Sequence, residues 1–261
     1  MSKKKVIYTS IVGNYDHLIQ HLCVNDDYEF VCFSNDIKES RVGIWEIRKI
    51  PYSTNDSQRL SRYAKMHPHE LFPTNDISIW MDANILISGP SFYEAIDFLE
   101  TRETVLLAGI KHPFRKCVYK EAAAVVRKRK ELNLFKIFKE MRFIKKEGLP
   151  QNFGMYEANI IYRKHHDFVI QDQCSLWWKM INQYSRRDQL AYSYTLWKFK
   201  LPFIYIFPEK ISSRNHPDLK YFSHIYNPDD TLKDRLWNRY VVKTVGRVLY
   251  RIYCILLNIE R

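Results

Sequence analysis

The sequence predicts an α/β protein built around a mostly parallel central sheet that helices flank. Three apolar segments that run into polar turn residues predict strands at residues 5–12, 30–33 and 77–81. Amphipathic segments at residues 57–71 and 168–184 predict helices. In sheets of this kind ligands bind beyond the carboxyl ends of the strands, so we expect the functional residues there.

The composition is that of an ordinary globular protein. The chain has 261 residues, 46% of them hydrophobic, and seven glycines, which excludes disordered and fibrous classes. No apolar run reaches 18 residues, so no membrane-spanning helix is predicted. Five scattered cysteines, none in a Cys-x-x-Cys pair, indicate a reducing cytosol and argue against a structural zinc site.

The net charge of +12 is concentrated in two segments. Residues 121–147 carry nine Lys or Arg against four Glu, and residues 231–261 carry seven against two acidic residues, which leaves +5 in each. Such blocks indicate local contact with phosphate, anionic lipid or nucleic acid. We therefore divide the chain into a domain at 1–230 and a basic amphipathic tail at 231–261.

The tail repeats a cation every four residues among apolar side chains. The cations are Arg235, Arg239, Lys243, Arg247 and Arg251. This pattern is typical of a helix that lies on an anionic membrane surface. A helix that docks on the protein's own domain would explain it too, and both interpretations stay open here.

The most informative stretch is Ile77–Ser88, where an apolar strand is followed by Asp82-Ala83-Asn84 and then by a second apolar run that continues it. A carboxylate and an amide in such a run cost several kcal/mol unless something pairs with them. A strand that ends in Asp-x-Asp or Asp-x-Asn is typical of enzymes that hold a divalent cation against a nucleotide diphosphate. The alternative is a simple strand end or Asx-turn.

Two earlier features point toward the same edge of the sheet. Polar residues follow the first two strands and would line one crevice, although each also suits a plain turn: Tyr15, Asp16, Asn35 and Asp36. The helix over 57–71, capped by Asn55 or Asp56, places Arg59, Arg62 and Lys65 near one face. These cations lead into the Asp82 strand, so we expect them to meet phosphates and not only solvent.

The second half of the chain supplies further candidates. A strand over 105–110 leads into a loop with His112 and Arg115, followed by a long charged helical region over 120–148. Glu157 and Asn159 lie two apart on a strand and hence on one face of the sheet. Asp188 opens a helix, where it is either catalytic or a simple helix N-terminal charge. A last strand is predicted at 203–207.

Five motifs together resemble a known family. They are residues 6–16, 30–36, 80–85, 112–122 and 187–192. The set is similar to a glycosyltransferase-like domain, once catalogued as a domain of unknown function, that occurs in bacterial polysaccharide loci and in plant Golgi proteins linked to mucilage and pectin. The resemblance covers residues 5–225. It implies a GT-A fold, which is Rossmann-like, and a nucleotide-sugar donor.

The resemblance also implies roles for individual residues. The donor would be bound by Thr9, Gly13, Tyr15, Asp16, Asn35, Asp36, Arg59, Arg62, Lys65, Asp82, Ala83 and Asn84. Asp82 and Asn84 would bind Mn²⁺ or Mg²⁺, with His216 or His224 as a further ligand, because the neutral Asn84 replaces a second carboxylate and weakens the site. The acceptor would meet His112, Arg115 and Asn159.

The resemblance implies a transferase that moves a sugar from a nucleotide donor, a UDP-sugar first of all, to a surface polysaccharide such as lipopolysaccharide or to a lipid-linked glycan. Asp188, with Glu157 in reserve, would serve as general base in an inverting reaction or stabilise oxocarbenium-like charge in a retaining one. The protein would be cytoplasmic and peripheral on the inner face of the plasma membrane.

The alternatives to a transferase are a metal-dependent hydrolase of lipids or phosphoesters and a nucleic-acid-binding protein. No nucleic-acid motif is present, so we expect no nucleic-acid partner.

Overall fold

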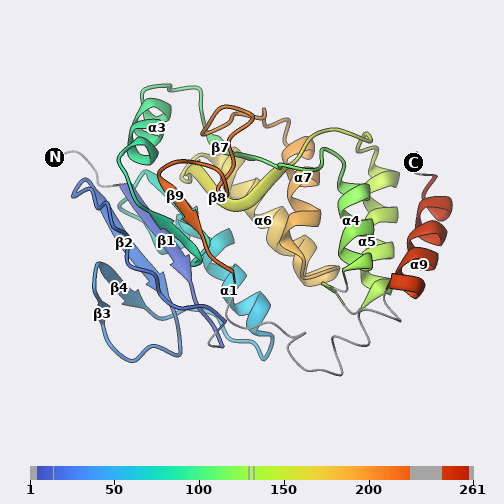
Figure 1. The fold of residues 1–261 in the computed structure, drawn as a ribbon, viewed down its shortest axis with the longest axis horizontal. Coiled ribbons are helices and arrows are strands. Elements are labelled where there is room, and N and C mark those ends of the chain that lie inside the picture. The colour runs from blue at the N-terminus through green and yellow to red at the C-terminus, as the bar shows by residue number, and fades with distance from the viewer. Residues whose placement is uncertain (1–4, 14, 129, 132, 224–242, 259–261) are drawn as a thin grey trace.

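The computed structural model describes residues 5–13, 15–128, 130–131, 133–223 and 243–258. A seven-stranded sheet forms its centre (Figure 1). In spatial order its strands are β3 (Arg41–Val42), β4 (Trp45–Arg48), β2 (Tyr28–Phe33), β1 (Lys5–Ser10), β5 (Ile77–Met81), β8 (Tyr156–Lys164) and β7 (Leu107–Lys111). Only β3 and β8 run against the other strands. The predicted α/β fold around a mostly parallel sheet is confirmed.

The central strands are buried on both faces, which explains their continuous apolar sequences. In β1, Val6 and Tyr8 belong to the core on one face of the sheet, whereas Ile7 belongs to the core on the other. All five residues of β5 are buried. The sheet therefore separates two largely apolar layers.

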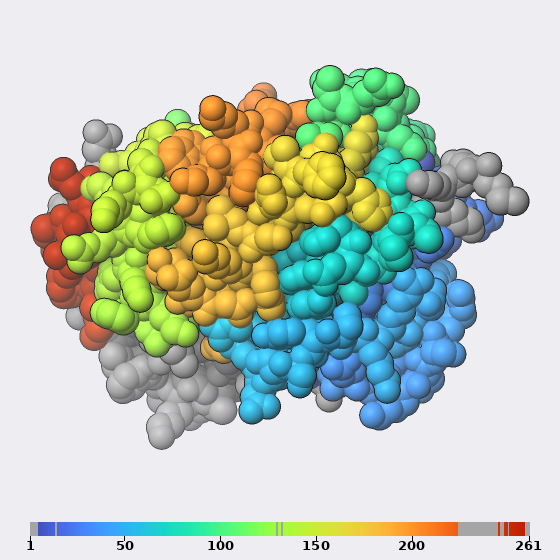
Figure 2. All heavy atoms as spheres, turned by 180° about the vertical axis from the view of Figure 1, so that it is seen from behind, coloured from blue at the N-terminus to red at the C-terminus, as the bar shows by residue number. Residues whose placement is uncertain are grey.

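Helices cover both layers. They are α1 (Ser57–Met66), α2 (Pro68–Leu71), α3 (Ser91–Glu100), α4 (Val118–Arg127), α5 (Leu134–Glu147), α6 (Phe168–Gln183), α7 (Asp188–Lys198) and α9 (Lys243–Leu256). Most of them contribute buried residues to the core that holds Tyr8, namely α1, α4, α5, α6, α7 and α9, whereas α3 belongs to the opposite core. From behind, Figure 2 shows α9, in red, against the yellow-green α4–α5 pair at one end of the molecule.

Local sequence explains where several helices begin and end. Asp56 caps α1 by accepting a hydrogen bond from the Arg59 amide at 3.1 Å, as predicted. The helix predicted over 57–71 is divided, because His67 precedes Pro68 and a residue before proline disfavours helical geometry. The region over 120–148 is likewise two helices, α4 and α5, and Gly148 ends α5 with a positive φ of 101°.

Two strand predictions are wrong. Residues 203–207 form no strand; Tyr205 makes only an isolated bridge to Gly109. The run after Asp82 does not continue β5. Instead β6 (Ile85–Ile87) turns away and pairs with β9 (Leu219–Tyr221) in a separate antiparallel ribbon. The turn at 82–85, closed by the Ile85 amide on the Asp82 carbonyl at 3.1 Å, therefore stands at the end of the large sheet.

The described part of the tail packs on the domain. Tyr253 and Cys254 of α9 are buried, and the Tyr253 ring lies 5.3 Å from that of Phe138. The opposite side of α9 exposes Val245, Val248, Ile252, Ile255 and Leu256. Residues 231–242 lie outside the described part of the chain. Among the residues that the structure describes, no helix is long and apolar enough to cross a membrane.

Candidate active site

The candidate site is centred on Asp82, directly after β5. The Asp82 amide donates to the Asn159 carbonyl of β8 at 2.8 Å, which fixes the backbone between two strands. The Trp80 indole donates to Asp82 Oδ1 at 2.8 Å. The Asp82 side chain keeps 35% of its surface exposed, so this carboxylate is held in place yet accessible. Burial raises its pKa, the Lys65 charge opposes this, and the Asp188 charge adds to it.

Lys65 joins Asp82 to Asp188. Its Nζ lies 2.7 Å from Asp188 Oδ2 and 3.8 Å from Asp82 Oδ1. The ammonium lies over the Trp80 ring at 5.1 Å and the Trp177 ring at 5.7 Å, so two indoles shield it from water. The helix α1 and the start of α7 thereby meet at the end of β5, as the sequence could not show.

Asp188 is an ionised, buried carboxylate. Arg62 Nε lies 3.6 Å from its Oδ1, and Trp177 donates to its backbone carbonyl at 2.9 Å. Burial would raise the pKa of Asp188, but the charges of Lys65 and Arg62 outweigh it and hold the pKa well below its usual range. A carboxylate this strongly stabilised as an anion is a weak proton acceptor.

Glu157 is the contrasting carboxylate. It and Asn159 both reach Ser213, since Asn159 Nδ2 donates to Ser213 Oγ at 2.7 Å and Ser213 Oγ donates to Glu157 at 3.5 Å. Arg214 forms an ion pair with Glu157. Burial raises the pKa of Glu157, although Arg214 opposes this. Glu157 and Asn159 share one face of the sheet, as their spacing predicts.

The oxygen atoms near Asp82 suit a hard divalent cation. Asn84 Nδ2 donates to the Phe222 carbonyl at 2.7 Å, which leaves its Oδ1 buried without a hydrogen-bond partner in the described part of the chain. Asn159 Oδ1 is likewise buried and has no hydrogen-bond partner among the described residues. A carboxylate with two amide oxygens fits Mg²⁺ or Mn²⁺, which prefer oxygen ligands. Among the described residues, no group of three or more His, Cys, Asp or Glu could hold a metal.

Of the two histidines proposed as further metal ligands, only His216 lies in the described part of the chain. His216 Nδ1 accepts the Asp218 amide at 3.1 Å, and its ring packs on Phe207 at 4.1 Å. Burial lowers the pKa of His216. These contacts give it a structural task in the loop before β9. His224 lies outside the described residues.

The predicted donor residues divide into two groups. The turns after β1 and β2 do meet, because Asp36 accepts the Gly13 amide at 2.7 Å. Burial and the Asp16 charge raise the pKa of Tyr15, and the nearby charges of Arg187 and Arg62 oppose this, so Tyr15 lies in the neighbourhood of both arginines. Thr9 Oγ1 is buried without a partner among the described residues. Ala83 lies in the turn after Asp82, half-buried.

Other predicted donor residues are engaged elsewhere. Asn35 Oδ1 accepts the Ile50 amide at 3.0 Å, which stabilises the loop after β2. Arg59 pairs with Asp56 at 2.7 Å and donates twice to the Ile181 carbonyl at 3.2 Å. It therefore ties α1 to α6, while Arg62 and Lys65 face Asp188.

Two of the three predicted acceptor residues, His112 and Arg115, lie in a second charged group, whereas Asn159 lies beside Asp82. Arg115 pairs with Glu121 at 2.7 Å, and His112 Nε2 lies 3.8 Å from the same carboxylate. His112 Nδ1 accepts two backbone amides, at 3.2 Å and 2.9 Å. Burial, reinforced by Arg115, Arg214 and Lys130, lowers the pKa of His112 to about 4. His112 is thus neutral at physiological pH.

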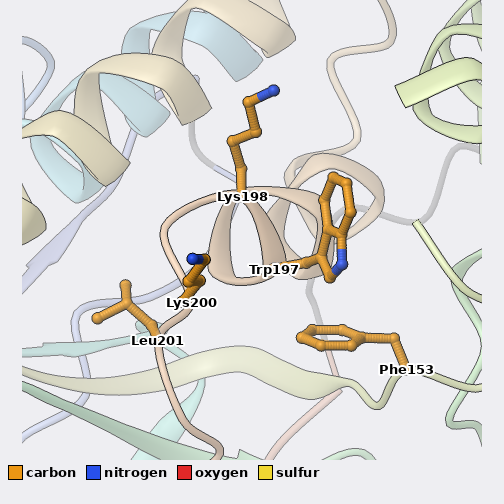
Figure 3. A pocket seen from close by; sticks show the side chains of 5 residues that line it. All are labelled: Phe153, Trp197, Lys198, Lys200 and Leu201. Atoms are coloured by element: carbon orange, nitrogen blue, oxygen red, sulfur yellow. The ribbon is translucent and has the colours of Figure 1, made fainter. Parts of the chain in front are cut away.

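Several residues of the site were not selected from the sequence: Trp80, Trp177, Arg187, Ser213, Arg214 and Glu121. Arg187 directly precedes Asp188, and that adjacency was the one available signal. A pocket of about 500 Å³ lies apart from all of them, between Phe153, Trp197 and Leu201 with Lys198 and Lys200 at its edge (Figure 3). It is at the far end of α7 from Asp188, about 15 Å along the helix.

A match to a family model shows which family the chain belongs to. The model of the TOD1/MUCI70 glycosyltransferase-like domain matches residues 21–215, well over half of the chain. The chain belongs to this family. The family predicted from the five motifs is therefore confirmed, and the match supports neither the hydrolase nor the nucleic-acid-binding alternative.

One named relative is distant from this chain. A protein of Arabidopsis thaliana named as the probable hexosyltransferase MUCI70 is 28% identical over 165 residues, which are 59% of this chain and 27% of that protein. The match thus spans about a quarter of the length of its curated relative.

Three solved glycosyltransferase structures show weaker likeness. They are the bifunctional WbbM in its apo form (10% identity, TM-score 0.43, 75% of this chain and 38% of that one), the galactosyltransferase LgtC with donor and acceptor sugar analogues (11%, 0.41, 94% and 95%) and apo GlyE of Streptococcus pneumoniae TIGR4 (16%, 0.39, 97% and 63%). The family assignment rests on the domain match alone.

Proposed function

We propose that this TOD1/MUCI70 domain transfers a hexose from a nucleotide sugar, a UDP-sugar first of all, to a growing surface polysaccharide such as lipopolysaccharide or to a lipid-linked glycan. The observation that carries the proposal is the accessible Asp82 at the carboxyl end of β5, tied through Lys65 to Asp188. Strand ends of an open α/β sheet are where nucleotides bind. The cations Arg62 and Lys65 would meet the donor diphosphate there.

The proposal includes a divalent cation, Mn²⁺ or Mg²⁺. Asp82 with the unpartnered oxygens of Asn84 and Asn159 would hold it. When bound, such an ion neutralises the charge that develops on a departing diphosphate. The protein's own part is to fix Asp82 through Trp80 and the Asn159 carbonyl, so that this carboxylate needs no reorientation.

The two carboxylates of the site suit different tasks. Asp188 stays ionised across the working pH range and would orient Lys65 and stabilise positive charge. Glu157, whose pKa is raised by burial, is better matched to accept the proton of an acceptor hydroxyl. We infer that Glu157 takes the proton in an inverting reaction. In a retaining reaction Asp188 would serve as the stabilising anion.

The first test is donor binding. We expect one nucleotide class in a panel of UDP-, GDP-, CMP- and dTDP-sugars to raise the melting temperature by mass action, and Mn²⁺ to enlarge the shift. Asp82→Ala should abolish the metal-dependent part of the shift. Asp172→Ala, an exposed carboxylate on α6, is the matched control and should behave as wild type. If no nucleotide shifts the melting temperature with metal present, the transferase proposal is wrong.

We further propose that α9 rests on an anionic membrane, which would make the protein peripheral on the inner face of the plasma membrane. Five apolar side chains of α9 remain exposed, and the segment over 231–261 has a net charge of +5. An apolar face among cations suits a lipid surface with negative headgroups.

Point variants test the membrane proposal better than deletion, because removing α9 would uncover the buried surface of α4. Ile255→Gln with Leu256→Gln should reduce binding to phosphatidylglycerol vesicles at least tenfold in a sedimentation assay. Phe168→Gln, which changes the most exposed apolar side chain of α6, is the control. The proposal would be contradicted if the α9 double variant bound these vesicles as well as the control variant does. It would also be contradicted if wild type bound neutral phosphatidylcholine vesicles as well as phosphatidylglycerol vesicles.

A further inference from the structure

A group of cations beside the Asp82–Asp188 site has no task in donor or metal binding. We call Arg115, Lys130, Arg187 and Arg214 the basic cluster. They come from the loop before α4, the loop after it, the residue before α7 and the loop before β9. Arg115, Lys130 and Arg187 act on the Glu121 carboxylate, and Arg115, Lys130 and Arg214 act on His112, which places the four around one region.

The basic cluster contains more positive charge than its surroundings neutralise. Glu121 pairs with Arg115 and Glu157 pairs with Arg214, which leaves Lys130 and Arg187 without an ion pair in the described part of the chain, although the Asp188 charge acts on Arg187. Burial lowers the pKa of Lys130, and the charges of Arg187 and Lys128 lower it further. Burial likewise lowers the pKa of Arg187. Lys130 and Arg214 are exposed and Arg187 is half-buried, so these like charges meet at the surface, where a bound anion could reach them and would offset their repulsion.

Arg187 is the clearest sign of a missing anion. Within the described part of the chain its guanidinium makes no ion pair, and its Nε is buried without a hydrogen-bond partner. An arginine fork of this kind matches a carboxylate or a phosphate with two parallel hydrogen bonds. Because Arg187 immediately precedes Asp188, an anion bound to it would lie next to the candidate catalytic carboxylates.

We propose that the basic cluster binds an acidic group, a carboxylate or a phosphate, on the acceptor glycan. The proposal rests on the transferase function and names its acceptor class. The cluster is on the acceptor side because Arg214 holds Glu157, the candidate proton acceptor, whereas Arg62 and Lys65 face Asp82 and Asp188. Neutral His112, whose Nδ1 accepts two backbone amides, lies beside this group with its Nε2 3.8 Å from Glu121.

The experiment compares matched acceptor probes on the full chain by titration calorimetry. One pair is a uronic-acid oligosaccharide and the same oligosaccharide with its carboxyl groups reduced to alcohols. The other is a hexose 1-phosphate and the free hexose. We expect wild type to bind the acidic member of at least one pair about tenfold more tightly, which corresponds to about 1.4 kcal/mol. The pair that discriminates identifies carboxylate or phosphate as the group.

Lys130→Gln should remove most of that preference and leave affinity for the neutral probes unchanged. Arg142→Gln, which removes an equal charge from an exposed site on α5, is the control and should keep the preference. Equal affinity of wild type for acidic and neutral probes, or an identical preference in both variants, would overturn the inference. The donor melting shift is measured alongside: its absence would refute the transferase proposal, whereas its presence without an acidic preference would refute this inference alone.

Discussion

Lys65 carries a charge in a place where a charge is costly. It is 3% exposed, and burial of an unpaired ammonium would cost several kcal/mol. Asp188 provides the opposite charge, 123 residues later in the chain, and two indoles enclose the pair. The spacing of Lys65 with Arg62 predicts a shared helix face, but the partner of Lys65 lies too far along the chain for any pattern to reveal.

Removal of the Lys65 charge should therefore lower the free energy of unfolding. Lys65→Met removes the closer of the two cations that pair with Asp188 and leaves only Arg62, 3.6 Å from Oδ1, to offset the buried carboxylate. We expect the free energy of unfolding at pH 7 to fall by about 3 kcal/mol. The depressed pKa of Asp188 stabilises the folded protein only above the unfolded pKa of about 3.9, and this contribution is lost as the pH falls towards the folded pKa. The loss in Lys65→Met should thus be smaller at pH 3 than at pH 7 in urea unfolding.

The double variant Lys65→Met with Asp188→Asn is the control for this pair. It removes both charges, so it should lose less stability than the sum of the two single losses. Additive losses would show that the two groups do not stabilise one another.

At the scale of elements, α5 holds the loop that leads into α7. Glu140 of α5 is fully buried and accepts the Ser185 amide at 3.3 Å, while the Ser185 hydroxyl donates to Glu131 at 3.3 Å. Burial raises the pKa of Glu140 well above its usual value, although the Ser185 hydrogen bond opposes this, and Glu131 raises it further. The loop that carries Arg187 and Asp188 is thus fastened by a carboxyl group that favours its neutral form.

This predicts a pH-dependent stability. A carboxyl group whose pKa is higher in the folded than in the unfolded state stabilises the fold fully below the unfolded pKa of about 4.3, and the effect is lost as the pH rises through the folded pKa. Glu140→Gln imitates the protonated form. We expect the variant to match wild type at pH 4 and to exceed it at pH 8, by about 1.4 kcal/mol for each unit of pKa elevation.

Thermal melts at both pH values measure the effect of Glu140. Glu103→Gln, which changes an exposed carboxylate, is the control and should not alter the pH dependence. A Glu140→Gln variant that is less stable than wild type at pH 8 would show that the ionised form is the one the fold requires.

At the scale of the whole molecule, the sequence predicts those strands and helices that short local patterns of residues determine. The buried strands β1, β2 and β5 and the caps of the helices follow from short runs of residues, so the α/β class could be predicted. The ribbon of β6 and β9 could not, because it pairs segments more than 130 residues apart and β9 has only three residues. The segment at 203–207 does lie against the edge strand β7, where Gly109 exchanges backbone hydrogen bonds with Ile204 and Ile206, but the pairing stops at this single bridge.

The candidate site shows the same division. Asp82, Arg62 and Lys65 could be selected because they follow a predicted strand or lie on the helix that leads into it. Asp188 could be selected at the start of a predicted helix, and the structure brings all four together. Arg59 could not be separated from them, because only the tertiary fold directs it to the Ile181 carbonyl. Arg187 and Arg214 belong to loops whose positions depend on α7 and β9. The roles of all these residues stay predictions.

The position of β1 has a practical consequence for anyone who shortens this chain. The family match begins at residue 21, yet β1, at residues 5–10, is the strand between β2 and β5. The match ends at residue 215, before β9 and before the Phe222 carbonyl that receives the Asn84 side chain. A fragment cut at the recognisable borders would expose two unpaired strand edges in the middle of its sheet and invite aggregation. The matched segment lacks two strands, β1 and β9, on which the rest of the described fold depends.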